Sequence, residues 1–152
     1  MGRYLLLALM LARHAAADPC ADGKPVVVGT KTYGTKYSIV SAAPAGSPAV
    51  AAPNTAISAL VVGTLKNGTL FWNSSSPPVA KPPHPGWFDY NYTMPVKGLI
   101  VGFDVGNYMM KQGETRQLCI PAAEGYGNSS RPGIPAQSTL IFTITAEKVT
   151  PP

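Results

Sequence analysis

The side chains that most often carry out catalysis are scarce in this sequence. Its two histidines are His14, within an apolar N-terminal stretch, and His84, within a run of prolines. A nucleophilic mechanism needs a histidine held beside a Ser or Cys, and neither position favours one. Of the seven acidic residues, Asp104 and Glu114 are predicted to face solvent or to cap turns, which argues against paired catalytic carboxylates. The spacing of the His, Cys and acidic residues matches no metal site, and no glycine-rich phosphate loop follows a strand, so we expect neither metal nor cofactor.

The two cysteines leave two interpretations open. Cys119 lies inside an apolar, strand-like run, which favours a buried thiol. Pairing with Cys20 is the alternative, and it requires an oxidising compartment. The residues before Cys20 do not form a lipoprotein motif.

Composition narrows the class of protein. Only 12% of the 152 residues are charged, which excludes a long solvated helix or coiled coil. The 15 glycines and 16 prolines favour short strands joined by turns. The net charge is +5, but lysine and arginine are spread singly, without a basic patch, so we expect no nucleic-acid partner.

The first 17 residues resemble a signal peptide. Residues 5–12 are uncharged and apolar, they follow Arg3, and small residues precede Asp18. This apolar stretch is much shorter than the ~20 residues that span a bilayer. The alternative is a retained amphipathic segment that anchors the chain to a partner.

Four Asn-x-Ser/Thr triplets accompany this N-terminal pattern, and they begin at Asn67, Asn73, Asn91 and Asn128. If the chain enters the endoplasmic reticulum, these triplets are glycan acceptor sites. We therefore expect an exported protein in a lumenal or extracytoplasmic compartment, either the endoplasmic reticulum or secreted space, or a thylakoid lumen.

Hydrophobic periodicity predicts a single domain of strands with one short helix. Residues 18–35 form an N-terminal extension, which is either an edge strand or an extended tail. Residues 36–149 form the domain, and residues 150–152 are a short C-terminal tail. The domain contains a proline-rich insertion at about residues 75–89. The helix is expected within residues 96–110, entered and left by glycines. Strands are expected at 36–40, 56–65, 70–72, 88–94, 115–121 and 138–149. The predicted class is α+β, a curved antiparallel sheet wrapped around one short α-helix.

Four segments of the domain resemble FKBP-type peptidyl-prolyl cis-trans isomerases. They read VVGTLKNGTLF, GLIVGFDVGNYMMKQGE, IPAAEGYG and GIPAQSTLIFTITAEKV, and they occur in the order of the family pattern. The resemblance covers about residues 36–149 and implies a curved sheet around a short helix. It also implies rotation about X-Pro bonds in proline-containing polypeptides, a reaction in which no protein group exchanges a proton.

The resemblance also implies the site residues. Three correspond to catalytic positions: the hydroxyl of Tyr126, the backbone N–H of Ile100 and the ring of Phe142. The others correspond to substrate-binding positions on the walls and floor of an apolar pocket, and they are Phe71, Trp72, Tyr90, Leu99, Phe103 and Ile134.

Departures from the family pattern weaken the predicted activity. Trp72 replaces an aspartate that helps to organise the pocket, and Val61 replaces an aromatic residue. The proline-rich insertion lengthens a loop beside the expected pocket mouth. We therefore expect reduced isomerase activity and weak binding of macrolides such as tacrolimus. The alternative is a non-catalytic binding or scaffold module, such as a lumenal accessory subunit of a membrane protein complex, for example a photosynthetic one.

Overall fold

The computed structural model describes residues 18–76, 86, 88–93 and 98–152. The predicted segment 1–17 and most of the predicted insertion 75–89 lie outside these residues. The described residues contain two helical segments, α1 (Val101–Gly106) and the 3-10 helix η1 (Ala122–Glu124). The strands of the described residues are β1 (Lys24–Val28), β2 (Lys31–Ser41), β3 (Ala56–Leu65), β4 (Leu70–Asn73), β5 (Phe88–Asn91), β6 (Thr115–Ile120) and β7 (Leu140–Thr150).

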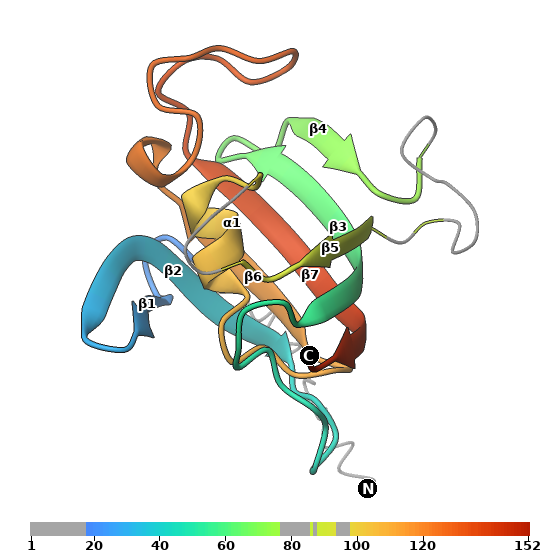
Figure 1. Ribbon diagram of the computed structural model, residues 1–152. Helices are drawn as coiled ribbons and strands as arrows, with labels where there is room; N and C mark the ends of the chain where they lie inside the picture. Colours follow the sequence, from blue (N-terminus) through green and yellow to red (C-terminus); the bar gives the residue numbers. More distant parts are fainter. Residues whose placement is uncertain (1–17, 77–85, 87, 94–97) are drawn as a thin grey trace, which may run out of the picture.

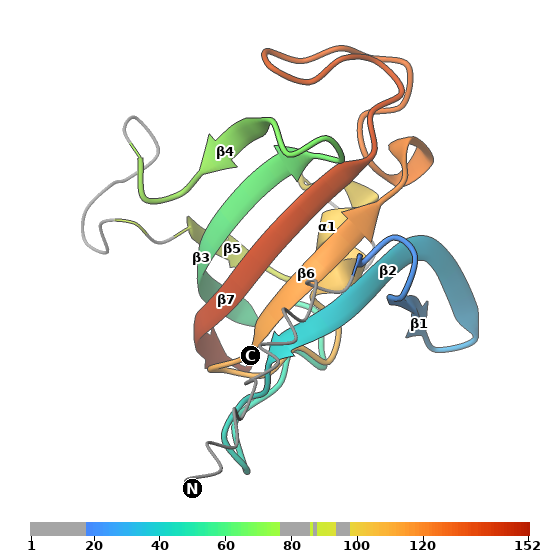
Figure 2. The same cartoon turned by 180° about the vertical axis from the view of Figure 1, so that it is seen from behind.

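These strands form one antiparallel sheet in the order β1-β2-β6-β7-β3-β4, and β5 also pairs with β3. Strands β3 and β7 pair along their whole length, from Ala56 opposite Thr150 to Leu65 opposite Leu140. The other edge of β3 is shared, because β5 pairs with its first half and β4 with its second half. The sheet curves around α1, which covers one of its faces (Figures 1 and 2). The predicted α+β class is confirmed.

Alternation along the long strands builds the core. In β7, Leu140, Phe142, Ile144 and Ala146 are buried, and the residues between them are partly exposed. Successive strand side chains point to opposite faces of a sheet, so one face of β7 is directed at the helix. The sequence periodicity had this pattern, which is why this strand was predicted closely.

Two glycines allow α1 to approach the sheet closely. A Cβ added at Gly102 would lie 2.4 Å from Cγ2 of Ile120, and one added at Gly106 would lie 2.4 Å from Cδ1 of Leu118. Such distances are far inside van der Waals contact, so only glycine fits at either position. The prediction that the helix is left at a glycine holds, since Gly106 is the last residue of α1. Gly102 lies inside the helix, and its role is the close contact with β6.

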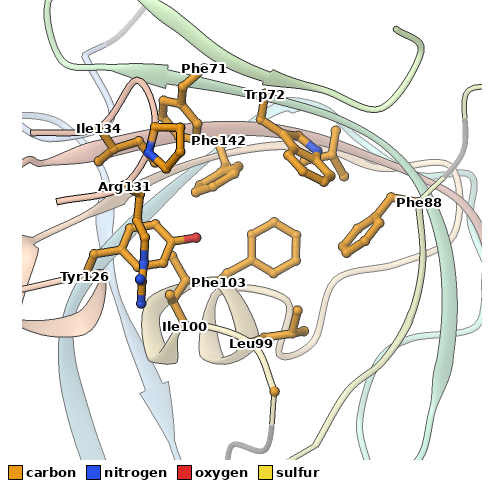
Figure 3. Close-up of a pocket in the computed structure, with 14 residues that line it drawn as sticks. Phe71, Trp72, Phe88, Leu99, Ile100, Phe103, Tyr126, Arg131, Ile134 and Phe142 are labelled. Atoms are coloured by element: carbon orange, nitrogen blue, oxygen red, sulfur yellow. The ribbon is translucent and has the colours of Figure 1, made fainter. Parts of the chain in front are cut away.

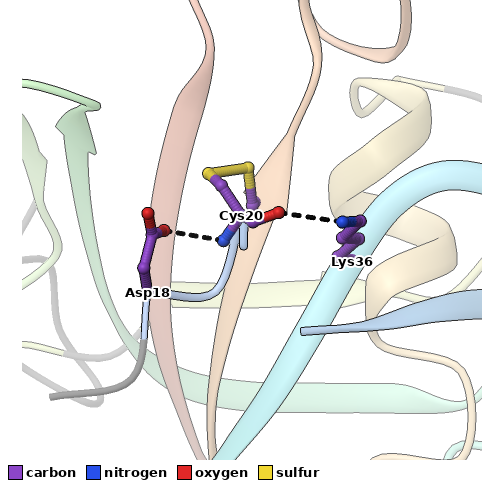
Figure 4. Close-up of a disulfide and its surroundings, with 4 residues drawn as sticks. Asp18, Cys20 and Lys36 are labelled. Atoms are coloured by element: carbon purple, nitrogen blue, oxygen red, sulfur yellow. Dashed lines mark hydrogen bonds between the residues drawn. A yellow bond between two sulfur atoms is a disulfide. The ribbon is translucent and has the colours of Figure 1, made fainter. Parts of the chain in front are cut away.

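Cys20 and Cys119 form a disulfide, so the expectation of a buried free thiol at Cys119 was wrong (Figure 4). The turn that carries Cys20 lies across β2, where Lys36 Nζ donates to the Cys20 carbonyl at 2.9 Å. Lys36 is also the cross-strand partner of Cys119 on β6. The pairing depends on how β1, β2 and β6 are ordered in the sheet, which spacing in the sequence does not reveal.

Strand β2 begins at Lys31, five residues before the predicted strand at 36–40. Together with β1 it extends the sheet beyond β6, so the N-terminal extension at 18–35 is part of the sheet. Within the described part of the chain, no helix has the length and hydrophobicity needed to cross a bilayer.

Candidate functional site

An apolar cavity of about 640 Å³ lies between α1, the sheet and the loop that follows β6 (Figure 3). Eight of the nine residues predicted for the site line this cavity, and Tyr90 is the one that does not. Val61 also contributes to the wall, while Trp72 stands at one side and leaves the cavity open (Figure 3). Its lining consists of Val61, Phe71, Trp72, Phe88, Gly98, Leu99, Ile100, Phe103, Gly125, Tyr126, Arg131, Pro132, Ile134 and Phe142.

Phe103 projects from α1 and forms the floor of the cavity (Figure 3). Its ring meets that of Phe142 edge to face, with ring centroids 5.0 Å apart at 80°. Phe142 in turn meets Phe71 at 5.5 Å and 84°. Aromatic rings prefer these edge-to-face arrangements, so the three phenylalanines hold one another in place across the helix and two strands.

Gly63 makes room for this ring cluster, which leads to a first prediction. A Cβ at this position would lie 2.7 Å from Cε2 of Phe71 and 2.9 Å from Cε1 of Phe142. Gly63→Ala is expected to lower the free energy of unfolding by about 1–3 kcal/mol, because the rings must shift. Urea denaturation and the near-ultraviolet circular dichroism of the pocket aromatics measure the effect. Val62→Ala, which alters a neighbouring exposed side chain, serves as the control, and an equal loss in the two variants would contradict this account.

Phe88 occupies the wall position that the sequence analysis gave to Tyr90, so that prediction is corrected. The Phe88 ring meets Trp72 edge to face at 5.7 Å and stacks on Tyr90 at 5.2 Å. Tyr90 therefore lies behind Phe88, and its hydroxyl donates to Asn107 Oδ1 at 2.9 Å. Burial, followed by the nearby Asp104, raises the pKa of the Tyr90 phenol above its ordinary value.

Alternation within β5 places Phe88 and Tyr90 on the same face of the strand, so the sequence could not tell them apart. The register decides between them, because Phe88 is opposite Ala59 and Tyr90 is opposite Ile57. The site thus gains Phe88, and Tyr90 supports it from behind.

Tyr126 lies in the loop after η1, and its hydroxyl points into the cavity (Figure 3). The loop is fastened to β2 through Glu124, which sits two residues earlier in the chain. Oε1 of Glu124 accepts from the Gly34 N–H at 2.7 Å, and Oε2 accepts from the N–H and hydroxyl of Thr35 at 2.8 and 2.6 Å. These three hydrogen bonds fix the position from which Tyr126 reaches the pocket.

Ile100 and Leu99 form the rim at the start of α1. The Ile100 carbonyl accepts the N–H groups of Phe103 and Asp104, each at 3.1 Å. The Ile100 N–H donates to no acceptor among the described residues. This donor is therefore unsatisfied by the neighbouring chain at the edge of the cavity.

Asp104 is buried, so the expectation that it faces solvent or caps a turn was wrong. Only 1% of its surface is exposed, and its Oδ1 accepts the Thr93 N–H at 3.0 Å. Its Oδ2 has no hydrogen-bond partner among the described residues. Burial raises the pKa of the Asp104 carboxyl above its ordinary value of 3.8.

This burial predicts a specific pH dependence of stability. Because the folded-state pKa of Asp104 is raised, the stabilising contribution of its protonated form is complete below the unfolded-state pKa and is lost as pH rises through the folded-state pKa. Asp104→Asn keeps an acceptor for Thr93 and removes the buried charge. We expect it to raise the Tm at pH 8 by roughly 2–4 °C, corresponding to about 1 kcal/mol, with a smaller effect at pH 4. Thermal melts at both pH values measure this, with the exposed Asp22→Asn as control, and a larger gain at pH 4 would disprove it.

Glu114 is also buried, contrary to expectation, and it pairs with Arg116. Arg116 Nε lies 2.6 Å from Glu114 Oε1, and the two side chains are each 4% exposed. Arg116 also donates to the carbonyls of Gly106 and Tyr108, at 2.8 and 3.0 Å. The pair therefore satisfies carbonyl groups at the C-terminal end of α1, the helix that carries Phe103.

The cavity offers rings, a phenolic hydroxyl and a backbone donor. Across the described residues, no cluster of three or more His, Cys, Asp or Glu side chains could hold a metal ion. Such a site can bind an apolar group of moderate size and orient polar atoms attached to it.

Comparisons with known proteins match this geometry. Solved structures similar to this chain include FkpA from Escherichia coli, with a TM-score of 0.64 and 27% identity over 86% of this chain and 54% of that chain. They also include AtFKBP13, with a TM-score of 0.60 and 25% identity over 76% of this chain and 92% of that chain.

Among curated proteins, FK506-binding protein 3 of Candida albicans is 35% identical over 99 residues, which are 65% of this chain and 21% of that protein. FK506-binding protein 4 of Emericella nidulans is 30% identical over 129 residues, covering 81% of this chain and 25% of that protein. The chain thus spans only about a fifth to a quarter of these relatives. The sequence model of FKBP-type peptidyl-prolyl cis-trans isomerases matches residues 48–147. With this match over most of its length, the chain belongs to the FKBP-type peptidyl-prolyl cis-trans isomerase family.

Proposed function

We propose that this chain accelerates cis-trans isomerisation of X-Pro bonds in polypeptides, using the cavity above Phe103. Amide resonance gives this rotation a barrier of ~18–20 kcal/mol. The barrier falls if the enzyme binds the twisted amide more tightly than either planar form. Twisting needs no proton transfer, so a pocket without an acid or base is sufficient.

The ring-lined cavity is the observation that carries the proposal. The proline ring packs on Phe103 between Phe142 and Phe71, where aromatic walls exclude water from the amide. A twisted amide loses resonance, and its nitrogen and carbonyl become less polar than in the planar form. An apolar environment therefore favours the twisted form over the planar forms.

Two donors at the rim orient the peptide. The Tyr126 hydroxyl points into the cavity (Figure 3), and the Ile100 N–H has no acceptor among the described residues. Each can donate to a carbonyl of the bound chain. The departures at Trp72 and Val61 reduce the fit around the proline, so we expect a rate below that of family members with an aspartate and an aromatic residue at these positions.

The test compares isomerisation of an X-Pro tetrapeptide by the wild type, Tyr126→Phe and Phe142→Ala. Removing the hydroxyl is expected to lower kcat/KM about fivefold, which corresponds to one hydrogen bond of about 1 kcal/mol. Phe142→Ala is expected to lower it further because it opens the wall. Tyr33→Phe removes a hydroxyl on β2, away from the cavity, and is expected to have no effect. No turnover by the folded wild type would overturn the proposal and leave the binding-module alternative.

We also infer that the protein works in an oxidising, extracytoplasmic compartment. The Cys20–Cys119 disulfide supports this, because disulfides persist mainly outside reducing compartments. Asn67, Asn91 and Asn128, which begin three of the four glycosylation triplets, are exposed. N-terminal sequencing and glycosidase treatment of the natural protein test the inference. A reduced Cys20–Cys119 pair in that material, with residues 1–17 still attached and no glycan, would contradict it.

A further inference from the structure

Arg131 is the one charged side chain that lines the cavity in the described structure. It projects at the rim beside Tyr126, and its guanidinium carbon is 5.4 Å from the centre of the tyrosine ring (Figure 3). A single cation at the mouth of an otherwise apolar cavity gives that mouth a defined electrostatic preference.

No carboxylate of the chain neutralises this cation. All seven acidic residues are within the described part of the chain, and none of them forms an ion pair with Arg131. Glu124 is near in sequence, but both of its oxygens accept hydrogen bonds from Gly34 and Thr35. The residues that line the cavity include no Asp or Glu, so no acidic side chain on its walls competes for the cation.

The backbone holds Arg131 at the rim. Its N–H donates to the Ile134 carbonyl and its carbonyl accepts from the Ile134 N–H, both at 2.8 Å. Gly133 completes this tight turn with a φ of 75°, and the buried Ile134 side chain anchors it. Since the turn and the Tyr126 ring already restrict the side chain, little ordering is needed on binding, and the guanidinium N–H groups remain available.

We propose that Arg131 forms a carboxylate-binding subsite, which makes the cavity select prolines that stand next to Asp or Glu. Consecutive Cα atoms are 3.8 Å apart, so residues flanking a proline seated on Phe103 remain near the rim. A carboxylate there accepts charge-assisted hydrogen bonds from the guanidinium. This inference rests on the proposed function, because it concerns the peptide that the same cavity binds.

The experiment measures kcat/KM for matched peptides with Glu, Gln, Leu or Lys before the proline, and for a second set with the same residues after it. Glu and Gln have nearly the same shape, so the ratio of kcat/KM for the Glu peptide to kcat/KM for the Gln peptide isolates the effect of the charge. In the wild type at low salt, we expect kcat/KM for the Glu peptide of one set to be about fivefold higher than for the matching Gln peptide. The Lys peptide is expected to have the lowest kcat/KM. The ratio should fall with added salt, because Arg131 is exposed.

The variants Arg131→Gln and Arg131→Lys distinguish two roles of Arg131, namely binding of a peptide carboxylate and positioning of the Tyr126 ring. We expect the Glu-to-Gln ratio to fall to about one in Arg131→Gln and to be partly retained in Arg131→Lys, which keeps the charge but loses the bidentate geometry. Lys66→Gln removes an exposed cation outside the cavity and should leave the ratio unchanged. A uniform loss for every peptide in Arg131→Gln would mean that the residue only positions Tyr126, and the subsite would be disproved.

Failure of the proposed function gives a different result. If the folded wild type turns over none of the peptides, including those with Gln and Leu, the isomerase assignment fails. The subsite is then still tested by the affinities of the Glu-Pro and Gln-Pro peptides, measured by NMR titration. If the wild type turns over the peptides but kcat/KM is the same for the Glu and Gln peptides in both sets, the subsite is disproved and the isomerase assignment stands.

Discussion

Reduction of the Cys20–Cys119 disulfide is expected to lower the free energy of unfolding by about 4–5 kcal/mol. The two cysteines are 99 residues apart in the sequence, and closing a loop of that size restricts the unfolded chain strongly. For a domain of this length, such a loss corresponds to a fall in Tm of roughly 10–20 °C. Thermal and urea unfolding with and without a phosphine reductant measure the difference.

The cysteine variants separate the crosslink from the chemistry of the reductant. Cys20→Ser with Cys119→Ser is expected to match the reduced wild type and to lose any response to the reductant. Cys119→Ala with Cys20→Ser places an apolar side chain at the buried position, and it is expected to be slightly more stable than the serine pair. An oxidised and a reduced wild type with the same Tm would show that the crosslink contributes nothing.

The parts of the site that could be predicted from sequence lie in continuous motifs. Ile100 and Phe103 share one segment with α1, Tyr126 lies in another, and Phe142 lies on a strand whose alternation is regular. These motifs occur in the order of the family pattern, and the resemblance to the family is what predicted that their residues share one site. All four residues line one cavity in the structure. The curved sheet followed from the same periodicity.

The incorrect sequence predictions share one physical cause. Each concerns a contact between segments that are far apart in the sequence, which depends on strand register and on how the elements pack. Whether Phe88 or Tyr90 reaches the cavity depends on where β5 stops against β3. The disulfide depends on the turn before β1 crossing β2. Asp104 looked exposed because charged side chains usually are, but it is buried, and its Oδ1 accepts the N–H of Thr93 from the segment that follows β5. Local patterns carry no information about such contacts.

Arg116→Met is expected to lower the free energy of unfolding by about 3–5 kcal/mol, because it leaves the Glu114 carboxylate buried without its partner. The side chains of Glu114 and Arg116 are each 4% exposed, so water cannot replace the lost charge. The substitution also removes the donor that binds the carbonyls of Gly106 and Tyr108. Loosening this end of α1 should also disturb Phe103, so kcat/KM on an X-Pro peptide is expected to fall together with the urea midpoint.

A double variant keeps this prediction testable even if the single variant folds poorly. Glu114→Gln combined with Arg116→Met removes both charges, and we expect it to recover a large part of the lost stability, since an uncharged pair carries no unpaired buried ion. Lys148→Met changes an exposed cation on β7 and should alter stability by less than about 0.5 kcal/mol. If the double variant were no more stable than Arg116→Met, the main role of Arg116 would be to bind the helix carbonyls, and the buried charge of Glu114 would not be the source of the loss.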